Sequence, residues 1–406
     1  MSTTLDLDFV RAQFPAFSDP TLEGTRHFEN AGGSYACRQT IERLTRFYTQ
    51  TKLQPYPHYA AGQRGGEAMA EAQSRMAAYL GVESDELMIG PSTTQNTYVL
   101  ARAFRAGWAD GDRVVVTDQD HEANVGAWRR LAETGIDVVE WSADPTTGRL
   151  DPADLDRLLT DRTRLVAFTH CSNVIGHPNP VAEVVARARA VGARTVVDGV
   201  AYAPHGLPDV GALGADVYLF STYKTFGPHQ GVMTVRREVM AELANQSHGF
   251  NDGVIGKRLV PAGPDHAQVA AVGGVIDYLD ALHDHHFDDP AVPLERARRT
   301  HDLLQAQERS TLAPLLGFLV ERDGIRVLGP TSAEERAPTV ACDTERAPRA
   351  IAAALGELGI MASWGHFYAP RIVQRMGLDP ARGVLRMSFT HYTSDDDVQV
   401  LIAALD

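Results

Sequence analysis

Between about residues 85 and 235, short runs of hydrophobic residues alternate with stretches in which hydrophobic positions recur at helical spacing. This alternation is typical of a parallel β-sheet covered by helices. Residues 181–191 place four valines and an alanine on one helical face, and Gly192 follows as a stop signal. The predicted strands are RVVVTD (113–118), VVEW (138–141), RLVAFTH (164–170), RTVVD (194–198) and ADVYLF (215–220).

The pattern changes beyond about residue 266, where a helical stretch is followed by strand-like and helical segments in turn. These segments are AQVAAVGGVIDYLDAL (267–282), RVLG (326–329), TVAC (339–342), AIAAALGELG (350–359) and VLRMSFTHY (384–392). A chain of 406 residues exceeds the size of one usual hydrophobic core, so two domains are expected. We predict a large α/β domain over 27–265 and a smaller α+β domain formed by 1–26 and 266–406.

Charge and composition narrow the classes of partner. The chain has 38 basic and 52 acidic side chains, a formal net charge of −14, which argues against a nucleic-acid or an anionic membrane partner. The first residues, MSTTLDLDFVRAQFPAF, carry acidic side chains where a signal peptide would be positive, and no hydrophobic run reaches membrane-spanning length. We therefore expect a cytoplasmic protein that acts on a small molecule.

Neither a disulfide framework nor a metal site is expected. Cys37, Cys171 and Cys342 are widely separated and lack CxxC spacing. The segment LHDHHFDDP (282–290) combines three histidines with three aspartates, but they are adjacent in sequence rather than one helical turn apart. A solvated, acidic helix end is the favoured interpretation of that segment, and a metal site the less favoured one.

Polar residues follow four of the predicted strands, where ligands of such sheets gather. Asp198 comes directly after the fourth strand, and Lys224 lies in FSTYKTFGP just after the fifth. A lysine amine can form a Schiff base, and a nearby carboxylate can keep a pyridine nitrogen protonated, as pyridoxal phosphate requires. The alternative is that Asp198 caps a helix and Lys224 is a solvated loop residue.

Two further segments fit the same cofactor. GPSTTQNTYVLARAF (90–104) supplies a turn, hydroxyl groups and a helix N-terminus, so Thr93 and Thr94 are candidate phosphate ligands, although such residues are commonly only helix caps. His121 in DQDHEANVGAW follows the first predicted strand and could stack on a cofactor ring. A lone histidine at a strand end is more often structural.

Together these segments resemble the class V branch of fold-type-I pyridoxal-phosphate enzymes, which includes cysteine desulfurases, selenocysteine lyases, isopenicillin-N-epimerase-like proteins and kynureninase. The resemblance runs from HFENAGGS (27–34) to LRMSFTHYTSDDDV (385–398). It implies a mostly parallel seven-stranded sheet with helices on both faces, a smaller α+β domain, a pyridoxal 5′-phosphate cofactor and a homodimer.

The resemblance also implies a role for each matching residue. Lys224 would form the Schiff base, Asp198 would pair with the pyridine nitrogen, and His121 would stack on the ring. Ser221 would join Thr93 and Thr94 at the phosphate. Arg386 would hold the substrate carboxylate, with Asn30 beside it, a role that suits the planar fork of arginine.

Departures from the family pattern bear on the reaction. Desulfurases of this branch carry a nucleophilic cysteine in a loop that here reads GHFYAP (365–370), with Tyr368 at the place of the thiol. Two residues expected beside the cofactor also differ from the family pattern: Ala201 is at the position of a glutamine, and Tyr223 at the position of a histidine. Ser363 is at the position of an arginine. In relatives a partner-subunit threonine completes the phosphate site, whereas VPAGPDH (260–266) offers Gly263.

A desulfurase-like scaffold without the sulfur-accepting cysteine predicts β-elimination of a cysteine S-conjugate, with release of thiol, pyruvate and ammonia. It resembles the cysteine-free, lincosamide-type enzymes of antibiotic pathways. Three alternatives stay open: decarboxylation coupled to oxidation to an aldehyde, epimerisation of an amino acid with Tyr223 or Tyr368 as proton donor, and a noncatalytic scaffold. The presence of Lys224, Asp198 and Arg386 argues against the scaffold.

Overall fold

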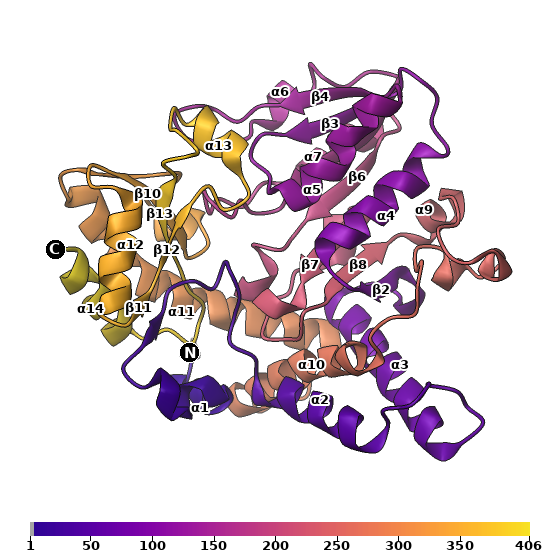
Figure 1. Ribbon diagram of the computed structural model, residues 1–406, viewed down its shortest axis with the longest axis horizontal. Helices are drawn as coiled ribbons and strands as arrows, with labels where there is room; N and C mark the ends of the chain where they lie inside the picture. The colour runs from indigo at the N-terminus through magenta and orange to yellow at the C-terminus, as the bar shows by residue number, and fades with distance from the viewer. Residues whose placement is uncertain (1–3) are drawn as a thin grey trace.

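The central feature of the fold is a seven-stranded, mostly parallel sheet, seen in a computed structural model that describes residues 4–406 (Figure 1). The strand order is β2-β8-β7-β6-β5-β3-β4, and only β8 runs antiparallel to its neighbours β2 and β7. The strands are β2 (Leu87–Gly90), β3 (Arg113–Thr117), β4 (Asp137–Trp141), β5 (Thr163–Thr169), β6 (Arg194–Asp198), β7 (Val217–Ser221) and β8 (Gly231–Val235). All five predicted strands are confirmed.

Helices cover both faces of this sheet, as predicted, because successive strand residues point to opposite sides. Val114 and Leu165 belong to one buried cluster with residues of α4 and α5, whereas Val115 and Val166 belong to a second cluster with residues of α3, α7 and α10. The helices of this part are α2 (Arg38–Gln50), α3 (Ala60–Leu80), α4 (Thr93–Arg105), α5 (Glu122–Arg129), α6 (Pro152–Leu155), α7 (Val181–Ala190), α8 (Val210–Leu213), α9 (Arg237–Glu242) and α10 (His266–His286).

A smaller four-stranded antiparallel sheet, in the order β12-β13-β10-β9, forms the second part of the fold, at the left of Figure 1. Its core joins Leu316 of α11, Leu355 of α12, Met387 of β13 and Leu401 of α14, which confirms the predicted α+β character. The elements are α11 (Pro293–Glu321), β9 (Ile325–Val327), β10 (Thr339–Thr344), α12 (Pro348–Glu357), β12 (Ser363–Gly365), α13 (Pro370–Arg375), β13 (Val384–Ser388) and α14 (Asp395–Leu405).

The N-terminal segment packs against the C-terminal part of the chain. After α1 (Leu7–Ala12), the short strand β1 (Arg26–His27) pairs in parallel with β11 (Ile360–Met361). The histidine-rich end of α10 also contacts this segment, since His285 stacks on Phe9 at 3.8 Å and its Nε2 donates a hydrogen bond to the Asp6 carboxylate at 2.9 Å. In residues 4–406 no cluster of three or more His, Cys, Asp and Glu side chains is arranged to hold a metal ion.

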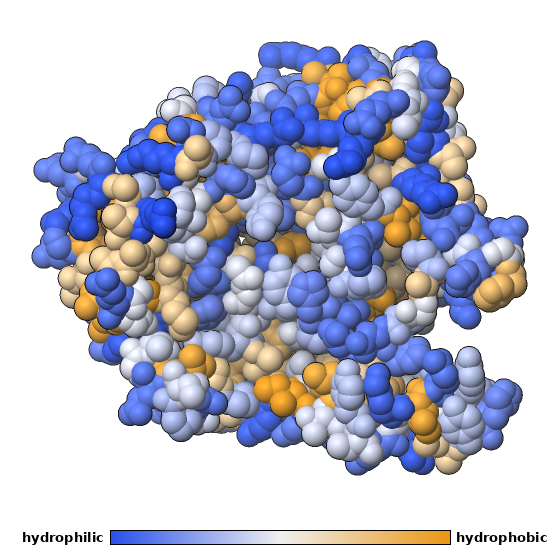
Figure 2. Space-filling model, viewed as in Figure 1, coloured by the Kyte–Doolittle hydropathy of each residue, from blue (hydrophilic) through white to orange (hydrophobic). Residues whose placement is uncertain are grey.

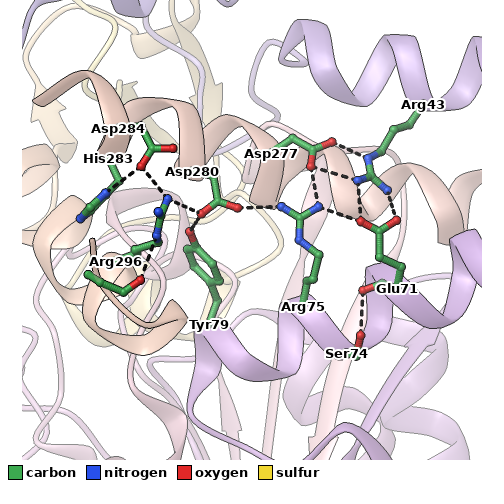
Figure 3. A network of polar contacts seen from close by, with 11 residues as sticks. Arg43, Glu71, Ser74, Arg75, Tyr79, Asp277, Asp280, His283, Asp284 and Arg296 are labelled. Carbon is green, nitrogen blue, oxygen red and sulfur yellow. Dashed lines mark hydrogen bonds and ion pairs between the residues drawn. The ribbon is translucent and has the colours of Figure 1, made fainter. Parts of the chain in front are cut away.

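A network of charged side chains fixes α10 to α2 and α3 (Figure 3). The Asp277 carboxylate of α10 accepts hydrogen bonds from Arg43 of α2 and Arg75 of α3. Arg75 also donates a hydrogen bond to Asp280 at 2.7 Å. Arg296 of α11 donates to Asp280 at 2.9 Å. The predicted domain boundary at residue 265 stays a prediction. The packing of α10 on α2 and α3 favours grouping this helix with the large domain.

Gly274 allows α10 and α2 to approach closely, because a Cβ atom there would lie 2.4 Å from the backbone nitrogen of Thr40. We expect Gly274→Ala to lower the free energy of unfolding by about 1–3 kcal/mol through overpacking. Gly317 of α11 is the matched control, since it is exposed and has no atom within 4 Å of such a Cβ. Gly317→Ala is expected to stabilise the protein by about 0.5–1 kcal/mol, as alanine favours helices. Chemical denaturation of both variants measures the difference, and equal effects would contradict the proposed close contact.

The face of the molecule drawn in Figure 2 is mostly hydrophilic, with hydrophobic residues in small separate patches. Among the described residues, none of the helices has the length and hydrophobicity needed to cross a membrane. The cytoplasmic location stays a prediction.

Candidate active site

Eight of the predicted site residues line one cavity of about 200 Å³ at the carboxyl ends of the parallel strands. We call it the inner cavity. It is the position at which open α/β sheets bind their ligands. The predicted residues that line it are Thr93, Thr94, His121, Asp198, Ala201, Ser221, Tyr223 and Lys224.

The amine and the carboxylate reach this cavity from neighbouring strands. Asp198 ends β6, and Lys224 lies in the short 3₁₀ helix η6 (Thr222–Lys224), directly after β7. Both side chains are buried. Burial lowers the pKa of Lys224 to about 8, helped by the positive charge of Arg386, while Asp198 opposes the shift. Burial raises the pKa of Asp198 to about 6, although the hydrogen bond donated by the Val200 N–H at 2.9 Å lowers this pKa.

Hydroxyl groups and a helix N-terminus meet at one end of the inner cavity. Thr93 and Thr94 are the first residues of α4, where backbone N–H groups have no helical partner, and the Thr93 hydroxyl lies 2.8 Å from that of Ser221. Gly231 of β8 permits this arrangement, since a Cβ atom there would lie 2.5 Å from the backbone nitrogen of Thr93. The N-terminus of a 13-residue helix with adjacent hydroxyls is suited to a phosphate group.

His121 provides a flat ring on the wall of the inner cavity. It is the N-cap of α5, and its Nδ1 accepts a hydrogen bond from the Ala123 N–H at 3.0 Å, which fixes the ring orientation. Burial, together with the positive charges of Lys224 and Arg386, lowers the pKa of His121 to about 3. The imidazole is therefore neutral, as suits a ring that stacks rather than one that carries charge.

A second cavity of about 640 Å³, which we call the outer cavity, adjoins the first and shares His121, Asn173, Tyr223 and Lys224 with it. Its other lining residues are Glu29, Ala31, Gly32, Ser363, Trp364, Gly365, His366, Phe367, Tyr368, Pro380, Ala381 and Arg386. The predicted substrate-binding residues Arg386 and Tyr368 thus lie next to the amine of Lys224.

Arg386 of β13 is held by three contacts. Its Nη2 donates to Glu29 Oε1 at 2.7 Å, its Nη1 donates to the Asn173 carbonyl oxygen at 3.2 Å, and its guanidinium lies 3.8 Å from the centre of the Phe367 ring. The side chain is only 2% exposed. This positions one cation beside Lys224, where it can bind an anionic group of a substrate.

Comparison with known proteins identifies the family. The family described as Aminotransferase class-V matches residues 26–255 and 298–401. The chain belongs to this family. A relative, the Aminotransferase-like protein FGM3 of Gibberella zeae, is 32% identical over 420 residues that cover 100% of this chain and 99% of the relative. A probable cysteine desulfurase of Streptomyces coelicolor is 27% identical over 99% of this chain and 97% of its own length.

Solved structures show the same fold. The apo cysteine desulfurase of Thermococcus onnurineus superposes with a TM-score of 0.85 at 21% identity, over 100% of this chain and 98% of that one. The cysteine desulfurase CsdA of Escherichia coli gives a TM-score of 0.83 at 23% identity, over 99% and 98% of the two chains. The predicted fold-type-I architecture is confirmed.

The cofactor of this class-V enzyme is pyridoxal 5′-phosphate, and the donor groups of the inner cavity fit it. Lys224 would supply the amine for the covalent link, Asp198 the carboxylate for the ring nitrogen, and His121 the stacking ring. Thr93, Thr94 and Ser221 would supply hydroxyls for the phosphate. The chain is thus a pyridoxal-phosphate-dependent class-V enzyme similar to cysteine desulfurases.

Two predicted residues lie outside both cavities. Asn30 follows Glu29, but its Oδ1 accepts a hydrogen bond from the Tyr392 hydroxyl at 2.8 Å, so Glu29 rather than Asn30 pairs with Arg386. Gly263 lies between β8 and α10, and a Cβ atom there would have no neighbour within 4 Å. Its role as a partner-subunit contact stays a prediction, as does the homodimer.

Asn173 is a site residue that sequence reasoning did not assign. It lines both cavities, its Nδ2 donates to the Phe367 carbonyl oxygen at 2.9 Å, and its buried Oδ1 has no hydrogen-bond partner in residues 4–406. The available signal was its place after RLVAFTH, among the polar residues that follow the third predicted strand. Glu29 was missed as well, because nothing local indicates that it meets Arg386.

Proposed function

We propose that this class-V enzyme catalyses β-elimination of a cysteine S-conjugate, as a carbon–sulfur lyase that releases a thiol, pyruvate and ammonia. The observation that carries the proposal is the loop of residues 363–369, which contains Tyr368 and no cysteine. Desulfurases of the branch that this chain resembles use a thiol in this loop to accept sulfur. A similar probable cysteine desulfurase in Streptomyces coelicolor supports a sulfur-containing amino acid as substrate.

The three cysteines of the chain are poorly suited to replace the missing thiol. Cys37, Cys171 and Cys342 are all buried. Burial raises the pKa of Cys37 to about 11 and those of Cys171 and Cys342 to about 12. Cys171 lines the inner cavity, yet its Sγ donates to the Gly176 carbonyl oxygen at 3.2 Å. A thiol that stays protonated is a weak nucleophile.

The proposed reaction gives each residue of the site a task. Bound pyridoxal phosphate supplies an electron sink for negative charge at the α-carbon. Arg386 binds the substrate carboxylate and so orients the α-carbon toward Lys224. Lys224 removes the α-proton at Nζ, a task that suits an amine with a pKa near 8. Loss of the α-proton to Lys224 expels the thiolate from the β-carbon, and the thiolate takes up a proton and leaves through the outer cavity. Water then hydrolyses the remaining 2-aminoacrylate to pyruvate and ammonia.

Product analysis tests the proposed reaction. Purified holoenzyme is incubated with S-alkyl-L-cysteines in the presence of oxygen, and pyruvate, free thiol and carbon dioxide are measured. We expect pyruvate and thiol in equal amounts. Carbon dioxide with a sulfur-containing aldehyde would instead indicate oxidative decarboxylation, and recovery of racemised amino acid would indicate an epimerase. Lys224→Ala is the control for chemistry that does not need the enzyme.

A further inference from the structure

The outer cavity is far larger than a cysteine thiol requires. Its volume of about 640 Å³ is roughly three times that of the inner cavity at about 200 Å³. Cavities of a few hundred Å³ to about 1,000 Å³ usually hold ligands of drug size. The space beside Arg386 therefore accommodates a large substituent on the substrate, in addition to its amino and carboxylate groups.

Most of the charged or titratable side chains on its wall are already engaged, and His366 Nδ1 accepts a hydrogen bond from the Tyr368 N–H at 3.1 Å. Glu29 is paired with Arg386 at 2.7 Å, Lys224 is the cofactor lysine, and His121 is neutral because burial lowers its pKa to about 3. Small or hydrophobic residues form another part of the wall, namely Ala31, Gly32, Gly365, Pro380 and Ala381. A charged substituent that moves from water into this cavity would find no unpaired group of opposite charge. Its transfer would therefore cost free energy.

Two aromatic side chains that line the outer cavity are left open to solvent. Trp364 is 37% exposed and Tyr368 is 68% exposed, which is unusual for large rings that line a cavity. One side of the Trp364 ring faces the Arg349 guanidinium at 5.7 Å. The two rings thus offer hydrophobic surface that a ligand can cover, and flat groups pack well on such rings.

The backbone holds this aromatic wall in position. Phe367 and Tyr368 have φ values of 50° and 57°, in the left-handed region that non-glycine residues rarely adopt. The Asn173 amide donates to the Phe367 carbonyl oxygen at 2.9 Å, and the Glu122 N–H donates to the Tyr368 carbonyl oxygen at 2.8 Å. Such conformations persist where surrounding contacts fix them, and they concentrate at ligand sites.

We propose that the outer cavity selects substrates whose sulfur substituent is large, uncharged and flat, such as an arylmethyl group, and that Trp364 and Tyr368 determine this specificity. The proposal rests on the proposed function, because it concerns the substituent of the same cysteine S-conjugate. Small S-alkyl groups leave both rings exposed to water, whereas an aryl group covers them.

Binding of analogues that cannot lose a thiol tests the proposal separately from turnover. In each analogue a methylene group replaces the sulfur atom of the substrate. L-Norvaline corresponds to S-methylcysteine, and its ω-phenyl derivative corresponds to S-benzylcysteine. L-α-Aminoadipate corresponds to S-carboxymethylcysteine. Calorimetry with the holoenzyme should show the phenyl derivative binding at least about tenfold more tightly than norvaline. The aminoadipate should bind no more tightly than norvaline. Equal affinities for all three would overturn the proposal.

Variants assign the effect to the two rings. Trp364→Ala and Tyr368→Ala should each remove most of the phenyl preference, measured as the ratio of the affinities for the phenyl derivative and for norvaline, whereas Tyr368→Phe should retain the preference. Tyr48→Ala is the matched control, because Tyr48 is half-exposed on α2 and lines neither cavity. A phenyl preference that survives both alanine substitutions would refute the role of the rings.

The outcomes separate this proposal from the proposed reaction. A phenyl preference in the binding series without pyruvate or thiol from S-benzylcysteine would support the cavity specificity and contradict the elimination. Pyruvate and thiol formed with the same kcat/KM from S-methylcysteine and S-benzylcysteine would support the elimination and contradict the specificity.

Discussion

Lys224→Ala is expected to yield a colourless protein whose turnover falls by at least about a thousandfold. The reason is that Lys224 is the buried amine of the inner cavity, with a pKa lowered to about 8 by burial and by Arg386, so it can act both as the covalent anchor and as the base. Absorbance of the purified protein and pyruvate release measure the two roles.

A second substitution at the same position separates covalent chemistry from charge. Lys224→Arg keeps a cation in the inner cavity but cannot form a Schiff base. It should therefore be as colourless and inactive as Lys224→Ala. A yellow, active arginine variant would contradict the assigned role, and a colourless wild-type protein that takes up no added pyridoxal phosphate would support the noncatalytic scaffold.

Asp198→Asn is expected to lower kcat by about a hundredfold or more, even when pyridoxal phosphate is saturating. The buried carboxylate at the end of β6 would keep the cofactor's ring nitrogen protonated, and a neutral amide cannot do so. The amide oxygen can still accept the hydrogen bond from the Val200 N–H, so packing should be preserved.

Thermal unfolding of the Asp198→Asn protein provides the control for folding. An unfolding midpoint close to that of the wild type, combined with the loss of kcat, assigns the effect to the missing charge. Activity within about threefold of the wild type would show that Asp198 does not support the ring nitrogen.

Much of the fold was predictable because hydrophobic periodicity encodes local structure. The run RVVVTD became β3, RTVVD became β6, and residues 181–190 form α7, ending beside Gly192 as expected. Strands β2 and β8 were not among the strands predicted from the pattern. β2 has only the four residues LMIG, and β8 follows a turn rich in glycine and proline, so neither gives a strong local signal.

The candidate site was predictable only in part. Lys224 and Asp198 were found because they directly follow strands, and parallel strands bring their carboxyl ends to one edge of the sheet. Asn30 was expected beside Arg386, but Glu29 makes the contact with Arg386, whereas Asn30 lies in the turn that follows and accepts a hydrogen bond from Tyr392. A shift of one residue is below what sequence pattern can resolve.

The sequence by itself determined the class of fold, the lysine and carboxylate of the cofactor site, and the absence of a cysteine in the loop of residues 363–369. Only the tertiary structure decided that Glu29, Asn173 and Phe367 surround Arg386, and that the loop's rings line a large cavity. Periodicity reports on neighbours a few residues apart. The Glu29–Arg386 pair joins residues 357 positions apart, and this contact forms only when the N-terminal segment packs against β13.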